Sequence, residues 1–165
     1  MVVLVALGVA FGIKTFLIQP YYIPSASMTP TLAVGDRILV NKVAYHLHGV
    51  HRGDIVVFAK PPRDQGDPKV KDLVKRVIGL PGETISSASG HVLINGVPLQ
   101  EPYLPNGVNP GPPITKQVIP ANHYFMMGDN RGDSKDSRFF GPVDRSLFVG
   151  HVFMRVWPVS RIHIF

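Results

Sequence analysis

Hydroxyl side chains are concentrated in the segment IPSASMTPTL, residues 23 to 32, which holds two serines, two threonines and two prolines. A turn would explain these residue types, because proline fixes φ and a hydroxyl can hydrogen-bond to nearby backbone. A serine in such a turn could also act as a nucleophile if a base takes its proton. The segment contains no base of its own, so the base would have to come from elsewhere in the chain.

Lys75 is a candidate for this base. A lysine can accept a proton near neutral pH only if burial lowers its pKa from about 10.4. On a strand, the neighbours of Lys75 on the same face are Leu73 and Val77, so its amine would enter an apolar face. The adjacent Arg76 stays charged and cannot be the base. From the strand alone, an exposed place on an edge strand is the more common position for a lysine.

A third polar segment is GDNRGDSKDSR, residues 128 to 138. Its closely spaced charges, hydroxyls and glycines are typical of a solvated loop. The apolar stretches YFMM and FFGPV bracket it, which predicts a loop anchored between strands. Such a loop could hold fixed polar groups against a site.

The elements that would position these groups are mostly strands. The chain has 165 residues, 16 glycines and 16 prolines, and 45% of its residues are hydrophobic, which suits one turn-rich β domain. Alternating apolar residues and turn signals predict strands in the ranges 36–40, 53–58, 73–82, 91–99, 123–130 and 149–158. Asn95-Gly96 predicts a hairpin turn. Residues 105–113 read as a long loop, and 83–122 as an inserted hairpin and loop.

The N-terminus predicts a membrane anchor over residues 1–18, followed by a catalytic domain over 19–165. Lys14 is the only charge in this apolar run, which as a helix would span roughly 27 Å. A cleavable signal peptide would need a basic region in front of Val2. A buried core helix is the less favoured alternative for a run that is apolar on every face. The missing basic flank suggests that the native chain extends further towards the N-terminus.

Charge and composition exclude several classes of site. A formal charge of +6 favours anionic surfaces, but the basic residues are dispersed and not interleaved with stacking aromatics, so we expect lipid and not nucleic acid as the partner. With no cysteine, disulfides and thiolate metal sites are excluded. His46, His48 and His51 have no adjacent carboxylate and are interpreted as a solvated turn. We expect no metal and no cofactor.

The segments IPSASMTPTL, GDIVVF, KRVIGLPG and GDNRGDSKDSRFFGP, in this order behind an apolar N-terminus, resemble the sequence boxes of bacterial type I signal peptidases. The similarity covers nearly the whole chain, including the tail GHVFMRVWPVSR. The resemblance implies a membrane-bound serine protease that removes signal peptides from secretory preproteins with a Ser-Lys dyad. It also implies a mainly β, antiparallel fold and a catalytic domain on the outer face of the cytoplasmic membrane.

The same resemblance implies roles for individual residues. Ser27 matches the nucleophile and Lys75 the general base. Ser25 would join the backbone N–H of Ser27 in an oxyanion hole. Ser134 matches a hydroxyl that orients the lysine amine. The matching supporting residues are Asp136 and Arg138, with Arg76 and Asp129 as scaffolding that could form an ion pair.

The resemblance further implies that apolar residues near the nucleophile line shallow pockets for the small side chains of an Ala-x-Ala cleavage site. The matching positions are Ile23, Pro24, Met28, Leu32 and Val74. A shallow pocket excludes large side chains by overpacking. Core packing is the alternative for the apolar side chains among them, since such residues are usually inside.

One difference from the family pattern affects the pH range in which the enzyme would be active. The family often has Asp-Asn between the arginine and the serine of the last box, where this chain has Gly132 and Asp133. A carboxylate near Lys75 would favour the protonated amine. Either Asp133 points away from Lys75, or activity is displaced to higher pH.

Two other functions stay open. Another Ser-Lys peptidase of the same broad fold, such as a self-cleaving repressor, would also use Ser27 and Lys75. A catalytically inactive module that binds signal peptides at the membrane would need neither residue. No feature of the sequence indicates a particular oligomeric state.

Overall fold

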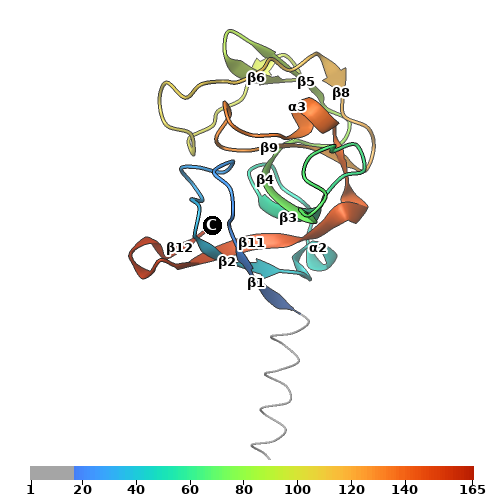
Figure 1. Ribbon diagram of the computed structural model, residues 1–165. Coiled ribbons are helices and arrows are strands. Elements are labelled where there is room, and N and C mark those ends of the chain that lie inside the picture. Colours follow the sequence, from blue (N-terminus) through green and yellow to red (C-terminus); the bar gives the residue numbers. More distant parts are fainter. Residues whose placement is uncertain (1–16) are drawn as a thin grey trace, which may run out of the picture.

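The computed structural model describes residues 17–165, which form two antiparallel sheets (Figure 1). The predicted anchor falls almost entirely outside the described residues. Its last residue, Ile18, is the first residue of strand β1. No helix within residues 17–165 is long and apolar enough to cross a membrane.

The larger sheet has eight strands and carries the candidate site. Its order is β1-β2-β11-β3-β4-β9-β10, and β12 pairs with β11. The strands are β1 (Ile18–Tyr22), β2 (Arg37–Asn41), β3 (Ile55–Ala59), β4 (Asp72–Gly79), β9 (His123–Met127), β10 (Val143–Asp144), β11 (Phe148–Trp157) and β12 (His163–Ile164). Five of the predicted strand ranges are found here, which confirms the mainly β, antiparallel fold class.

The second sheet has four strands in the order β7-β6-β5-β8. They are β5 (Thr84–Ala88), β6 (His91–Ile94), β7 (Val97–Pro98) and β8 (Gln117–Val118). The predicted hairpin turn is confirmed, because Asn95 and Gly96 join β6 to β7 with φ of 52° and 82°. In Figure 1 this sheet lies at the opposite end of the molecule from β1 and β2.

Helices in the described residues are short. They are α2 (Ala44–Leu47), α3 (Ser137–Phe140) and the 3₁₀ turns η1 (Arg145–Leu147) and η2 (Val159–Arg161). Helix α3 directly follows the polar loop of residues 128–136. Its N-cap is Asp136, whose side chain accepts a hydrogen bond from the backbone N–H of Arg138.

Strand β4 lies inside the large sheet, between β3 and β9. Its neighbour β3 is buried over four of its five residues, and β4 is buried from Lys75 to Gly79. Lys75 is therefore not on an edge strand, and a lysine at this place must either be paired or lose its charge.

Candidate active site

The serine-rich segment forms a turn that the core holds in place. Met28 and Leu32 are 2% and 0% exposed, and the backbone N–H of Leu32 donates to the carbonyl of Met28. Asn130 fixes the other side of the turn, because its side-chain amide donates to the carbonyl of Ala26 and its backbone N–H to the carbonyl of Ser27. Ser27 is thus fixed and half-buried, next to the loop of residues 128–136.

The structure brings Lys75 to Ser27, although 48 positions separate them in the chain. The Nζ atom of Lys75 donates a hydrogen bond to the Oγ atom of Ser27 across 2.6 Å. Lys75 is only 3% exposed. Burial disfavours the ammonium and lowers the pKa of Lys75 to about 8. Near pH 8, a large share of this amine is neutral and can accept a proton.

Several charges act on this amine besides burial. Asp136, Asp129 and Asp64 raise the pKa of Lys75, while Arg138 lowers it. Two of these carboxylates have an arginine partner in the interior. Arg138 lies 2.8 Å from Asp136, and both side chains are at most 1% exposed. Because Asp136 is already paired with Arg138, its stabilisation of the Lys75 ammonium is partly cancelled. Burial is therefore the largest effect, and the pKa of Lys75 is lowered.

The scaffold residues form the predicted ion pair. The guanidinium of Arg76 donates to both carboxylate oxygens of Asp129, at 2.8 and 2.6 Å. Thr31 donates to the same carboxylate across 2.5 Å. This pair connects the strand of Lys75, the loop after Gly128 and the turn that holds Ser27.

Ser134 lies close to the dyad but has no hydrogen-bond partner. Its buried Oγ atom is the one such unpaired side-chain atom among residues 17–165. A Cβ atom placed on Gly128 would lie 2.3 Å from both Ser134 Oγ and the carbonyl oxygen of Ser27. Ser134 and the Ser27 backbone therefore meet at Gly128. A buried hydroxyl without a partner is uncommon and requires an explanation.

Ser25 is exposed, and its Oγ atom lies 3.4 Å from Ser27 Oγ. This places a hydroxyl on the solvent side of the dyad.

The apolar positions predicted to bind substrate lie in different surroundings. Ile23, Met28 and Leu32 belong to a core cluster, and Val74 packs against it. Pro24 is exposed. The three cluster members are at most 3% exposed and so serve as core in this structure. Their contact with a substrate stays a prediction.

The departure at Gly132 and Asp133 has a structural explanation. Asp133 is exposed and is not among the main charges that act on Lys75. A Cβ atom on Gly132 would lie 2.7 Å from the amide nitrogen of Asn109, so glycine allows the loop of residues 105–113 to pack here. The carboxylates that oppose deprotonation of Lys75 lie elsewhere.

Sequence reasoning missed two supporting residues that follow β7. Glu101 forms an ion pair with Arg131 of the active-site loop, and both side chains are largely buried. The ring centroid of Tyr103 lies 3.9 Å from the guanidinium carbon of Arg76. These residues precede a Pro- and Gly-rich loop, and no local pattern signals their partners.

Comparisons with known proteins identify the family of the chain. Residues 1–157 match the family model described as signal peptidase, peptidase S26. Signal peptidase I of Leptolyngbya laminosa is 45% identical over 157 residues, which cover 93% of this chain and 75% of the relative. Signal peptidase IB of Staphylococcus aureus is 36% identical over 173 residues, which cover 95% of this chain and 87% of the relative.

A crystal structure of a signal peptidase I from Enterococcus faecalis has a similar fold. The TM-score is 0.53 at 32% identity, over 64% of this chain and 97% of that chain. The family model spans far more than half of the chain, and the relatives align over most of their own length. The chain therefore belongs to the signal peptidase I family, peptidase S26, and is a serine endopeptidase.

Proposed function

We propose that this chain cleaves signal peptides from exported preproteins after a small-x-small site, typified by Ala-x-Ala, with Ser27 as nucleophile and Lys75 as general base. Membership of the signal peptidase family supports signal-peptide removal. The observation that carries the dyad is the 2.6 Å hydrogen bond between Ser27 and a buried lysine whose pKa is lowered to about 8.

The proposed reaction has two halves. Ser27 Oγ attacks the scissile carbonyl while Lys75 takes the hydroxyl proton. The backbone N–H of Ser27 and the hydroxyl of Ser25 stabilise the oxyanion. When the tetrahedral intermediate collapses, the C–N bond breaks and the amine of the mature chain receives the proton from Lys75. Water, deprotonated by Lys75, then attacks the ester, and Ser27 recovers its proton as the signal peptide leaves with a new carboxylate.

Supporting groups keep Lys75 aimed at Ser27 in this proposal. Ser134 has an unsatisfied hydroxyl beside Gly128, which suits a group that orients the amine when substrate displaces the present hydrogen bond. Asp136 and Arg138 fix the loop that carries Ser134, because Asp136 also accepts from the backbone N–H of Gly128 across 3.0 Å.

Strand β4 offers a place for an extended substrate. On one side its residues Asp72 to Lys75 pair with β3, whereas on the other side the pairing with β9 begins only at Arg76. A peptide that adds to the open edge would run towards Ser27. Pro24 and Val74, which are not buried, would border this path. The buried Ile23, Met28 and Leu32 would set its depth, so that only small side chains fit.

We assign the reaction to the outer face of the bacterial cytoplasmic membrane, with residues 1–18 as a single-pass anchor. The apolar run with one charge supports this assignment. The bilayer and secretory preproteins are then the partners, and the dyad requires no cofactor.

The test is cleavage of a preprotein with an Ala-x-Ala site by the full chain in detergent or lipid, from pH 6 to 11. Ser27→Ala and Lys75→Ala should abolish the product that ends after the second Ala, as read by mass spectrometry. Lys69→Ala, which removes an exposed lysine, is the matched control. If the wild type binds the preprotein and cuts nothing at any pH, the inactive binding module is the correct function.

A further inference from the structure

The loop between β3 and β4, residues 60 to 71, is tied to the active-site loop by one ion pair. The Nζ atom of Lys135 lies 2.9 Å from Oδ1 of Asp64. Lys135 directly follows Ser134, and the β3–β4 loop leads into the strand that carries Lys75. The pair therefore joins the two chain segments that hold the base and its neighbouring hydroxyl.

The two members of the pair differ in exposure. The side chain of Asp64 is 5% exposed and that of Lys135 is 48% exposed. The loop also holds the carboxylate from its own side, because the backbone N–H of Gly66 donates to Asp64 Oδ1 across 2.9 Å. Lys60 closes the loop by donating to the carbonyls of Gly66 and Asp67. Asp64 is thus a fixed, largely buried charge.

This charge persists at the pH of the reaction. Burial raises the pKa of Asp64, but the hydrogen bonds from Lys135 and Gly66 lower it more, so the pKa stays below its usual value. Asp64 in turn favours the protonated form of Lys75. Asp136 and Asp129 act in the same direction, but their partners are the buried arginines Arg138 and Arg76. The partner of Asp64 is a half-exposed lysine.

We propose that Asp64 and Lys135 are a pair of positioning residues that sets the pH range in which Lys75 can act as base. Asp64 holds the proton on the amine, and Lys135 limits this effect by neutralising Asp64. The other charges near Lys75 are Asp136, Arg138, Asp129 and Arg76, while the turn of residues 23–32 carries none. The inference rests on the proposed function, in which Lys75 is the base.

The test removes each charge of the pair separately. Asp64→Asn keeps the shape and deletes the anion, so the acid limb of kcat/KM should move to lower pH by about half a pH unit. Lys135→Met deletes the cation and leaves Asp64 unneutralised, so the limb should move to higher pH. The double variant should return towards the wild-type midpoint. A purely structural role would instead reduce kcat in both single variants and leave the midpoint unchanged.

Two kinds of control variant show whether a shift of the midpoint comes from the charges of Asp64 and Lys135. Lys69→Met removes an exposed lysine from the same loop and should leave the midpoint unchanged. Asp64→Glu and Lys135→Arg each keep the charge of the residue they replace, so both should show the wild-type pH profile. They remain informative even if a neutral variant folds poorly. Midpoints that do not move, or that move the same way in both single neutral variants, would overturn the inference.

A titration without substrate separates this inference from the proposed function. The ¹³Cε shift of Lys75, assigned by its loss in Lys75→Ala, reports the protonation of the amine directly. It should show the same opposite shifts in Asp64→Asn and Lys135→Met. If the wild type does not cleave the preprotein, the proposed function is rejected, while the titration still measures the effect of the ion pair on the pKa of Lys75. A cutting enzyme with an unmoved titration would reject the ion-pair inference alone.

Discussion

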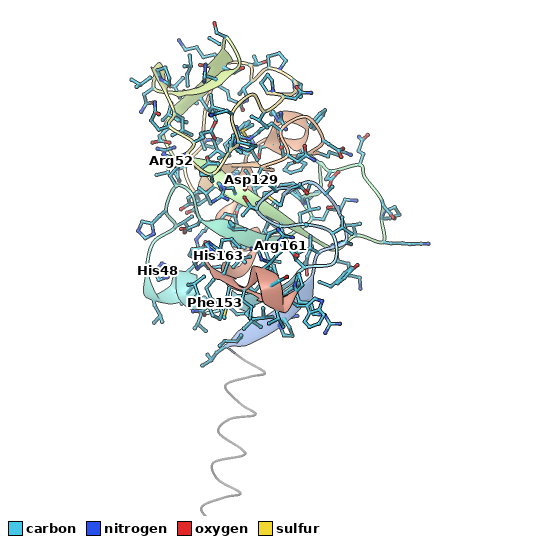
Figure 2. All side chains as sticks on the ribbon, turned by 90° about the vertical axis from the view of Figure 1, so that its left-hand side faces the viewer. His48, Arg52, Asp129, Phe153, Arg161 and His163 are labelled. Carbon is cyan, nitrogen blue, oxygen red and sulfur yellow. The ribbon has the colours of Figure 1, made fainter. Side chains whose placement is uncertain are left out.

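Arg76 and Asp129 hold each other through two hydrogen bonds at a place where the side chain of Asp129 has no exposed surface. Arg76 follows Lys75 in β4, and Asp129 follows Gly128 in the active-site loop. Figure 2 shows Asp129 in the middle of the molecule, above His163 and Arg161 and below the second sheet. The pair therefore fixes the distance between the strand of the base and the loop beside the nucleophile.

Removal of one partner from this pair should cost much more stability than removal of a surface charge. Asp129→Ala would leave Arg76 buried without its carboxylate, and we expect a loss of about 3–5 kcal/mol in the free energy of unfolding. Denaturant titration of the full chain in detergent measures it. Lys116→Met, at an exposed position, is the control and should stay within about 0.5 kcal/mol of wild type. A loss below about 1 kcal/mol for Asp129→Ala would mean that water reaches the arginine.

The resemblance to known sequence boxes suggested this pair, whereas the strand pattern alone favoured an exposed edge position for Lys75 over the buried one that the structure shows. The alternation of Leu73, Lys75 and Val77 indicates an apolar environment for the amine. It does not indicate that β4 has neighbours on both sides, since strand order depends on contacts between distant segments. The contacts of Glu101 and Tyr103 with the active-site loop were missed for the same reason.

The N-terminal strand was also missed. Ile18 to Tyr22 contains Pro20 and adjoins an apolar run, so local patterning assigned its first residue to the anchor and predicted no strand there. Pairing with β2 makes it a strand, from Ile18 opposite Asn41 to Tyr22 opposite Arg37. Only the partner strand supplies that information.

The buried amine of Lys75 should make stability depend on pH. Its pKa is about 8 in the folded protein and 10.5 in a model peptide, so the unfolded chain binds more protons between these values. The free energy of unfolding should therefore rise with pH from about 8 to about 10.5, by about 3 kcal/mol from this group. The rise should be absent in Lys75→Met.

The measurement is the difference in unfolding free energy between wild type and Lys75→Met, taken at intervals from pH 7 to pH 10.5. The difference cancels other groups that titrate in this range. At pH 7, Lys75→Met should be the more stable protein, because it replaces a buried ammonium with an apolar chain of similar length. A difference that stays flat with pH would show that the amine keeps a normal pKa.

Ser134 and Ser137 should separate activity from stability. Ser134→Ala removes a buried hydroxyl without a partner, so stability should hardly change, while kcat should fall about 10- to 100-fold if the hydroxyl orients Lys75. Ser137→Ala removes an acceptor for the backbone N–H of Met126, at 2.9 Å, and should cost about 1–2 kcal/mol of stability with kcat retained. Thermal melts and initial rates on both variants measure the two effects. The same pattern in both variants would contradict a role for Ser134 in positioning the amine.

Gly128 should tolerate no side chain, because it is the point where the active-site loop touches the nucleophile turn. In Gly128→Ala the new Cβ would start 2.3 Å from the backbone oxygen of Ser27 and from Ser134 Oγ, so the turn must move away from the loop. A displacement of about 1 Å between nucleophile and base is enough to reduce the rate about 100-fold. Gly49→Ala is the matched control, since a Cβ there would meet nothing within 4 Å. Initial rates should fall only in Gly128→Ala, and normal activity in that variant would show that the dyad does not depend on the contact between this loop and Ser27.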